Sequence, residues 1–274
     1  MKRTFIFTII SLLTLTFSTE SMAQKVNKSA KKAHKGWKLV WADEFDADKL
    51  DSTSWVRCNC DSYVSDWNRH MSSLDSLVTL KDGLLILHAI NTPQEYYDPK
   101  NRSHLTGGVD SHGMRSIHLG RVDVRARFDC AKGFWPAIWL LPDNGKSYLH
   151  GGEIDIMEHL NHEKIAYQTL HNEFTINKID PSIKSSGSQT INPSEFNIYS
   201  VIINQDSVEF LINGKPTFTY PRINTTHKYQ FPYADNPYYV ILSAQLGGTW
   251  VGAIEPKDLP AKMEIDYVRF YQKK

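Results

Sequence analysis

Apolar and polar residues alternate along much of this chain, and the pattern predicts strands in preference to helices. Between residues 120 and 129, Val122, Val124, Ala126 and Phe128 share one face, while charged residues occupy the other. A period of two over that length is typical of a strand with one buried side. Apolar runs bounded by turn residues predict further strands within 77–89, 199–220, 238–246 and 263–271.

Turn residues divide two of these runs into hairpins. Lys81-Asp82-Gly83 splits the first run into two strands, and turns at 204–206 and 213–214 split the second into three. The sequence contains no internal repeat and no amphipathic helix of ordinary length. Many short strands at near-regular spacing therefore predict an all-β fold, a β-sandwich of the jelly-roll type.

The first 23 residues have the features of a secretory signal peptide. Lys2 and Arg3 precede an apolar run from Phe5 to Phe17, and Ser21-Met22-Ala23 offers small residues for cleavage. We expect cleavage after Ala23 and secretion to the periplasm or the cell exterior. The apolar run is too short to span a membrane, and no other segment approaches the roughly 20 apolar residues that a spanning helix needs.

A basic segment, 24–36, precedes the predicted domain. It lacks the interleaved aromatic residues of a nucleic-acid-binding arm, so a flexible, solvated linker is the favoured interpretation. The remaining residues, 37–274, suit one large β domain, in which 94–106 and 179–193 are expected to be long exposed loops. With 31 basic and 30 acidic side chains the chain is nearly neutral. We expect a monomer without a nucleic-acid partner.

The three cysteines, Cys58, Cys60 and Cys130, leave the question of a disulfide open. Cys58 and Cys60 are too close in sequence for an easy mutual bridge, so either of them is a candidate partner for Cys130. Spacing alone does not decide between these pairings and free thiols. No neighbouring residues have the spacing of zinc ligands.

Three acidic residues in one short segment, 151–159, are the strongest candidates for chemistry. In a strand, Glu153 and Asp155 share one face, and the isoleucines that follow each of them point into the core. Glu158 would then face the core as well. A β-bulge near Ile156-Met157 inserts one extra residue and returns Glu158 to the acidic face, and we predict that bulge.

The alternative is a solvent-facing strand whose polar side happens to be acidic. Glu264-Ile265-Asp266 repeats the Glu-Ile-Asp order without a third carboxylate, and we interpret that strand as structural. Like charges on one strand face destabilise the fold, so a full triplet is costly unless it has a role. The third carboxylate, and not the Glu-x-Asp spacing, identifies the candidate site.

Paired carboxylates of this kind suit the hydrolysis of a glycosidic bond. The reaction needs one carboxylate beside the anomeric carbon and one acid beside the leaving oxygen, and retention of configuration requires a separation of about 5–5.5 Å. Two glutamates on one strand face suit that distance better than the roughly 6.5–9.5 Å of an inverting pair. The negative neighbours of Glu158 are expected to raise its pKa, which keeps it protonated as the acid. Asp155 is placed to hydrogen-bond and orient Glu153.

Aromatic residues near the triplet suit a sugar-binding cleft, because the CH-rich side of a pyranose stacks on flat rings. Trp135 and Trp139 share a strand face just before the acidic strand, with core packing of either as the alternative. Further candidate sugar contacts are Trp250 in a glycine-rich loop, the segment Trp67, Asn68, Arg69 and His70, and Gln168 and His171 on the following strand. A purely structural role for the histidine remains open.

At these residues the chain resembles glycoside hydrolase family 16, the laminarinase, agarase and lichenase group. The resemblance covers nearly all of the predicted domain and rests on four motifs in the family's order. They are WKLVWADEF at 37–45, FWPAIWLLP at 134–142, EIDIME at 153–158 and MEIDYVRFY at 263–271.

The resemblance implies a jelly roll with an open concave cleft and a retaining, endo-acting hydrolase that needs no cofactor for catalysis. It assigns Glu153 as the nucleophile and Glu158 as the acid/base, with Asp155 assisting. The five-residue step between the glutamates is similar to the bulged branch of the family, which contains laminarinases and agarases.

The resemblance also implies a structural calcium ion away from the cleft. The matching positions are Glu44, Asp266 and a backbone carbonyl near Gly83. The alternative is that both acids are ordinary surface residues.

The expected substrate is a polysaccharide or oligosaccharide, and the segment 66–71 bears on which one. Laminarinases carry an Asn-Asn-Glu-Leu-Gln-like segment here, where this chain has Asp-Trp-Asn-Arg-His-Met. An arginine and a histidine in these places are expected to change which sugar hydroxyls are recognised. With them the chain resembles slightly more the branch of the family that acts on β-1,4- or β-1,3-linked, galactose-containing chains such as poly-N-acetyllactosamine, O-glycans or galactan. The alternative is an endo-β-1,3(4)-glucanase. A transglycosylase and a non-catalytic carbohydrate-binding jelly roll are more distant alternatives.

Overall fold

The computed structural model describes residues 34–60, 65–94, 100 and 102–274. The signal peptide predicted at 1–23 and the linker residues 24–33 lie outside this range. Residues 34–36 belong to the folded domain and not to the linker, because His34 Nε2 lies 2.7 Å from Asp123 Oδ2 and the His34 ring packs edge-on against Tyr271. This corrects the predicted linker boundary at residue 36.

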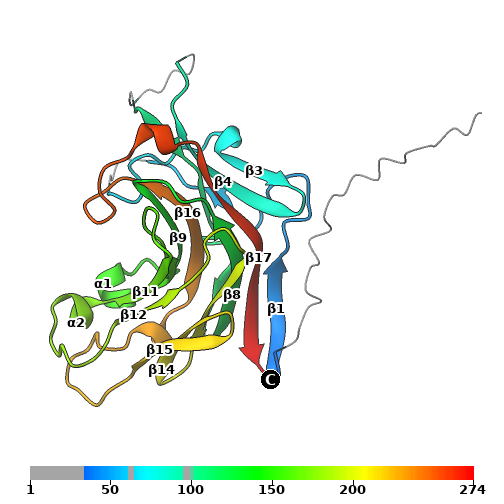
Figure 1. Cartoon of the computed structure of the whole chain (residues 1–274). Helices are drawn as coiled ribbons and strands as arrows, with labels where there is room; N and C mark the ends of the chain where they lie inside the picture. The colour runs from blue at the N-terminus through cyan, green and yellow to red at the C-terminus, as the bar shows by residue number, and fades with distance from the viewer. Residues whose placement is uncertain (1–33, 61–64, 95–99, 101) are drawn as a thin grey trace, which may run out of the picture. The chain divides into compact units, whose positions relative to one another are not determined.

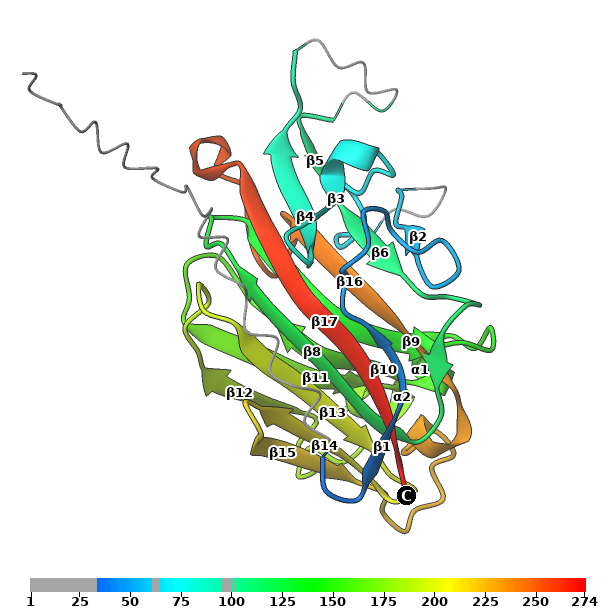
Figure 2. The same cartoon turned by 90° about the vertical axis from the view of Figure 1, so that its right-hand side faces the viewer.

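One sheet, called here the outer sheet, contains the predicted hairpins and both ends of the domain. Its strands are β1 (Trp37–Asp43), β3 (Val78–Lys81), β4 (Leu84–Asn91), β5 (His104–Thr106), β8 (Gly120–Phe128), β13 (Asn197–Ile203), β14 (Ser207–Ile212), β15 (Lys215–Pro221) and β17 (Ala261–Lys273). Their order is β15-β14-β13-β8-β17-β4-β3, with β1 beside β17 and β5 beside β4. Figure 2 shows β1, β17 and β8 running side by side across this sheet.

The second sheet, called here the cleft sheet, contains the acidic segment. Its strands are β2 (Val56–Arg57), β6 (Gly108–Asp110), β7 (Ser116–Ile117), β9 (Phe134–Pro142), β10 (Glu153–Glu158), β11 (Ile165–His171), β12 (Ser186–Thr190) and β16 (Tyr238–Leu246). Their order is β12-β11-β10-β9-β16-β6-β2, with β7 beside β16. The two sheets pack face to face (Figure 1), so the predicted all-β sandwich is confirmed.

Helices are few and short in the described residues, as the sequence predicted. The α-helices are α1 (Tyr148–Gly151) and α2 (Glu173–Ile176), and the 3₁₀ helices are η1 (Asp75–Leu77), η2 (Tyr233–Asp235) and η3 (Pro256–Asp258). Helix α1 leads into β10, and α2 follows β11, the strand that pairs with β10. None of the described helices has the length and apolar character that crossing a membrane requires.

The apolar faces of the two sheets form one continuous core. Val122, Val124 and Ala126 of β8 are fully buried there, together with Ile154 and Ile156 of β10. The alternation that predicted β8 therefore arises because every second side chain points between the sheets.

Tight turns join the predicted hairpins. Asp82 and Gly83 have φ angles of 54° and 72°, and Asn213 and Gly214 have 52° and 75°. Two consecutive positive φ angles are typical of a type I′ turn, whose twist matches that of the strands it joins. Asparagine, aspartate and glycine are the residues that adopt this conformation at the lowest cost.

The two predicted long loops are only partly loops. The segment 179–193 contains β12, an edge strand built from small polar residues that lack the apolar alternation by which strands are recognised. The end of 94–106 forms β5, and 95–99 and 101 lie outside the described residues.

All three cysteines are free. Cys58 and Cys60 are buried and Cys130 is exposed. The Cys58 thiol lies 3.7 Å from Asp110 Oδ2. Of the alternatives that the sequence left open, the structure has free thiols and neither candidate pairing with Cys130.

The Glu-x-Asp pair of β17 has the structural role that the sequence predicted. Glu264 Oε2 lies 2.5 Å from Arg127 Nε, and Asp266 Oδ2 lies 2.7 Å from Arg125 Nη1. Both arginines come from the neighbouring strand β8. Each acid of this strand therefore has a cationic partner within the sheet.

Gly152, which links α1 to β10, provides a test of how the acidic strand is positioned. Its φ is 87°, and a Cβ atom there would lie 2.5 Å from Tyr233 Cε1. We expect Gly152→Ala to destabilise the protein by about 2–4 kcal/mol in urea unfolding, from left-handed strain and overpacking together.

Gly145 is the matched control. It also has a positive φ, 76°, but nothing lies within 4 Å of its added Cβ. Gly145→Ala is expected to cost about 1 kcal/mol. Equal costs for the two variants would show that the Tyr233 ring does not require glycine at position 152.

Candidate active site

A β-bulge interrupts β10 between its acidic residues. Between Asp155 and Glu158, β10 has two residues, whereas the facing stretch of β11 has one, Gln168. On the β9 side the register shifts between Asp155 and Met157, so Ile156 is the extra residue. The bulge predicted at Ile156-Met157 is confirmed.

The bulge brings the three carboxylates to the same side of the sheet. Glu153, Asp155 and Glu158 line one cavity of about 500 Å³, whereas the apolar residues between them are buried in the core. A regular strand would turn Glu158 into that core, where a carboxylate without partners is costly.

Glu158 is held by a tryptophan of the adjacent strand. Trp135 Nε1, in β9, donates a hydrogen bond to Glu158 Oε1 at 3.0 Å. Because this oxygen is engaged as an acceptor, Oε2 is the oxygen left to carry a proton when Glu158 is neutral. The Trp135 ring meets Trp250 edge-on, with the ring centres 5.7 Å apart.

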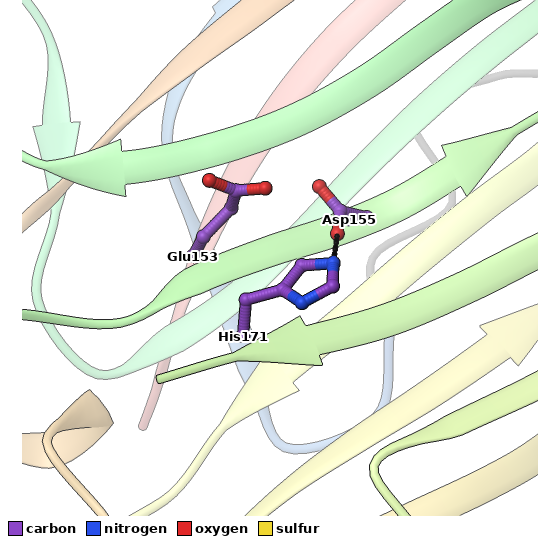
Figure 3. Close-up of side chains that lie close together, drawn as sticks. All are labelled: Glu153, Asp155 and His171. Carbon is purple, nitrogen blue, oxygen red and sulfur yellow. Dashed lines mark ion pairs between the residues drawn. The ribbon is translucent and has the colours of Figure 1, made fainter. Parts of the chain in front are cut away.

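His171 faces the other two carboxylates from β11. It lies opposite Glu153 in the strand register, and its Nε2 is 3.3 Å from Asp155 Oδ2 (Figure 3). Ligand atoms of Glu153, Asp155 and His171 all lie within 4.8 Å of one another, so these side chains could hold a metal ion. Such an ion would occupy the carboxylates that a sugar would meet.

Burial raises the pKa of all three carboxyl groups. That of Glu153 rises to about 8, mainly through burial and further through the charge of Asp155. The pKa of Glu158 also rises through burial and the charge of Asp155, and the Trp135 hydrogen bond opposes the rise. Burial raises the pKa of Asp155 in the same direction. Three adjacent, desolvated carboxylates therefore retain protons near neutral pH.

A cleft extends to both sides of these carboxylates. The part toward β16 is largely aromatic, with Trp67, Trp139 and Tyr239 in its lining. The part toward β12 is lined by Tyr167, Thr169, Ser186, Gly187, Ser188 and Trp250. Glu153 and Glu158 line both parts, so the acidic cluster lies where the two parts meet.

Several predicted sugar contacts lie in this cleft. The lining includes Trp67 and Trp139 in one part, Trp250 and His171 in the other, and Trp135 in both. Trp67 packs edge-on against Trp139 at 5.0 Å, so these two rings form one wall although they are 72 positions apart in the chain.

The three residues after Trp67 are not among the described residues that line the cleft. They contact other groups of the protein instead. Asn68 is buried and accepts a hydrogen bond from Ser65 N at 2.9 Å. Arg69 pairs with Asp66 at 2.6 Å, and His70 Nδ1 lies 3.1 Å from a backbone carbonyl. These three residues were predicted to contact sugar, and the structure gives them other partners.

The prediction for Gln168 is wrong. The residue has no exposed surface and points between the sheets, away from the cleft. Gln168 and His171 are three positions apart, so strand alternation places them on opposite faces. Tyr167 and Thr169, its neighbours, are the residues that face the cleft.

Gln245 of β16 is a cleft residue that the sequence interpretation missed. It lines the aromatic part of the cleft, and its Oε1 is buried without a hydrogen-bond partner among the described residues. The sequence contained a pattern that could have identified Gln245. It shares the less apolar face of β16 with Tyr239 and Ser243. Lys146, Tyr148 and His112 also line this part and lie in loops.

The residues matched to a calcium site have protein partners. Glu44 accepts two hydrogen bonds from Arg269, each of 2.8 Å, and Asp266 pairs with Arg125. Asp266 Oδ1 is buried without a hydrogen-bond partner in the described part of the chain. Guanidinium groups therefore already compensate much of this charge, and the calcium ion remains a prediction.

Comparison with known proteins agrees with this geometry. The family model "Glycosyl hydrolases family 16" matches residues 66–269. The chain belongs to this family.

Two curated relatives differ in the sugar that their names specify. The chain is 36% identical over 240 residues to a keratan-sulfate endo-1,4-β-galactosidase of Sphingobacterium multivorum, covering 86% of this chain and 55% of the relative. It is 29% identical to glucan endo-1,3-β-glucosidase A1 of Niallia circulans, covering 86% of this chain and 38% of that protein. The family 16 chain thus spans about half or less of the length of these relatives.

A solved structure supports the fold. It is described with the words "Prominent members of the human gut microbiota express endo-acting O-glycanases to initiate mucin breakdown". It matches with a TM-score of 0.75 and 29% identity, over 86% of this chain and 100% of that one. Together with the two antiparallel sheets, this confirms the predicted jelly roll.

The raised pKa of Glu153 makes the stability of the fold depend on pH. The folded state holds a proton up to about pH 8, whereas the unfolded state releases it near pH 4.3. Stability is therefore lost as the pH rises through this window. We expect Glu153→Gln to raise Tm over the parent by several degrees at pH 8 and by little at pH 4.5, because each kcal/mol shifts Tm by about 2–4 °C in a domain of this size.

Exposed Glu195 is the control for this measurement. Glu195→Gln should leave the dependence of Tm on pH unchanged. A Tm difference for Glu153→Gln that does not vary between pH 4.5 and pH 8 would contradict a raised pKa at Glu153.

Proposed function

We propose that this family 16 chain is an endo-acting glycoside hydrolase that cleaves internal β-linkages with retention of configuration. The observation that carries the proposal is the bulge of β10, which turns Glu158 to the side of Glu153 and Asp155 and beside the indole of Trp135. A carbohydrate-binding module would have no need for a bulge that gathers three carboxylates against their mutual repulsion.

In the first step, Glu153 acts as the nucleophile and Glu158 as the acid. A Glu153 oxygen attacks the anomeric carbon, the glycosidic C–O bond breaks, and Glu158 transfers its proton to the departing oxygen. In the second step, Glu158 removes a proton from water, and the water oxygen displaces Glu153 from the anomeric carbon. Two displacements at the same carbon restore the starting configuration.

The electrostatics of the cluster act in the same direction on both glutamates. Burial and the charge of Asp155 raise the pKa of Glu158 and that of Glu153, so the pair can hold a proton before the first step. The charge of His171 lowers the pKa of both glutamates, so the assignment of Glu153 as nucleophile and Glu158 as acid follows the family resemblance. Asp155 lies between Glu153 and Glu158 in the sequence and contacts His171, so we assign Asp155 the assisting role. No step requires a cofactor.

The position of the cluster within the cleft supports cleavage inside a chain. Lining residues continue from Glu153 and Glu158 toward β16 on one side and toward β12 on the other. A sugar chain therefore has room on both sides of the bond that breaks. Tryptophan rings in both parts offer faces on which pyranose rings stack.

For the substrate, we favour galactose-containing chains, with β-1,3(4)-glucan as the second candidate. Support comes from the 36% identity to the keratan-sulfate endo-β-galactosidase, against 29% for the glucan endo-1,3-β-glucosidase. In the segment 66–71, Trp67 is the residue that lines the described cleft. Transfer of the glycosyl group to a second sugar instead of water uses the same intermediate. Secretion and a monomeric state remain predictions.

Removal of the nucleophile tests the mechanism. We expect Glu153→Gln to lower kcat by at least about 10³-fold while calorimetry still detects oligosaccharide binding. NMR of the first product formed by the parent enzyme should give the β anomer. An α anomer at that stage would mean inversion, and normal turnover by the variant would remove Glu153 from its role.

A digestion panel tests the substrate. We expect poly-N-acetyllactosamine in keratan sulfate or mucin O-glycans to yield oligosaccharides of several lengths early in the digest, as internal cleavage requires. Laminarin, mixed-linkage glucan and agarose complete the panel, read by chromatography, with Glu153→Gln as the blank. Faster release from laminarin than from the galactose-containing chains would favour the glucanase.

A further inference from the structure

Gln168 is a fully buried polar residue for which the mechanism above has no use. It lies on β11, and its side chain has no exposed surface. A buried amide without hydrogen bonds would cost roughly 1–3 kcal/mol, so the partners of this side chain indicate what it does.

One end of the Gln168 amide binds the bulge. Its Nε2 donates to the backbone carbonyl of Ile156 at 2.9 Å. Ile156 is the extra residue of β10, and a bulge leaves its extra residue without a regular ladder partner. Since a carbonyl only accepts hydrogen bonds, the amide nitrogen and not the oxygen must face Ile156.

The other end of the amide reaches the opposite sheet. Gln168 Oε1 accepts a hydrogen bond from the hydroxyl of Thr217 on β15. The register of β14 and β15 shifts at this point, so Thr217 is itself an extra residue in its strand. Its hydroxyl also lies 3.1 Å from the carbonyl of Phe210. Gln168 thus links a bulge of the cleft sheet to a bulge of the outer sheet.

We propose that Gln168 is a positioning residue that maintains the bulge of β10 and so directs Glu158 toward the leaving oxygen, with Thr217 holding Gln168 in place. The inference rests on the proposed acid role of Glu158. Without the amide donor, the Ile156 carbonyl loses this hydrogen bond inside the core, and the strand gains by relaxing toward regular pairing. Regular pairing turns Glu158 toward the core and away from Trp135.

The side chain at this position must be both long and a donor. Methionine has nearly the same length and volume as glutamine but donates no hydrogen bond, so Gln168→Met removes the contact with little change in packing. Thr217→Val likewise removes only the hydroxyl. Neither substitution replaces a residue that lines the cleft.

The experiment compares leaving groups. An acid is needed to expel a sugar or phenol but not 2,4-dinitrophenol, and general acids contribute about 10²–10⁴-fold. We expect Gln168→Met to lower kcat about 10–100-fold on phenyl β-glycosides, since small misplacements of a catalytic group cost up to about 10²-fold. On the 2,4-dinitrophenyl β-glycosides the loss in the first step should be under about threefold.

The probes are the two aryl β-glycosides of GlcNAc-β1,3-Gal and of laminaribiose, which represent the two substrate candidates. Thr217→Val is expected to show the same selectivity for leaving group with a smaller loss. KM for each probe should change little in both variants, because no residue that lines the cleft has been altered.

Gln230→Met is the matched control. Gln230 is also buried and makes two hydrogen bonds to backbone groups, with Pro221 O at 2.9 Å and Ile223 N at 3.1 Å. Its loss should lower Tm without any selectivity for the leaving group. A purely structural role for Gln168 would give the same result in Gln168→Met and Gln230→Met, and would overturn the inference.

Glu158→Ala separates a failure of this inference from a failure of the proposed function. If Glu158→Ala has no selectivity for the leaving group, the acid assignment is wrong. If Glu158→Ala is selective and neither Gln168→Met nor Thr217→Val is, the positioning role alone is wrong. Should Gln168→Met not fold, Thr217→Val decides the outcome by itself.

Discussion

The β-bulge of β10 is the feature on which the candidate active site depends. A strand alternates its side chains between two faces, so an odd spacing of five between two glutamates cannot place both on one face. One extra residue, Ile156, corrects the alternation. The backbone carbonyl of this extra residue lies within the core, where the Gln168 side chain donates a hydrogen bond to it. The chemistry of the cleft and the packing behind it are therefore connected through one peptide group.

The two acidic strands differ in how their charge is compensated. In the outer sheet, arginines of β8 pair with Glu264 and Asp266 of β17. These ion pairs offset the free-energy cost of burying the two carboxylates. In the cleft sheet, the triplet of β10 has His171 as its ion-pair partner among the described residues. Burial and the charge of Asp155 raise the pKa of Glu153 to about 8, so protons reduce the charge of this cluster instead. Protons held in this way are available for transfer to a leaving group.

The cleft is asymmetric across this cluster. Aromatic rings brought together from distant parts of the chain line the side toward β16. Small residues of the edge strand β12 line much of the other side. An apolar wall recognises ring faces, whereas backbone and hydroxyl groups at a strand edge recognise sugar substituents by hydrogen bonds. The family defines the reaction class, and this asymmetric lining is where a preference among sugars would arise.

Much of the architecture and the catalytic segment followed from local sequence patterns. Alternation predicted β8 and the hairpins, and the odd spacing of Glu153 and Glu158 predicted the bulge, because both depend on the geometry of a single strand. Contacts between distant segments could not be predicted from such local patterns. The edge strand β12, the roles of Asn68, Arg69 and His70, the free thiols and the inward direction of Gln168 were all decided by tertiary structure. Each of these depends on which segments become neighbours, and a sequence pattern records the face a residue prefers but not the partner it will meet there.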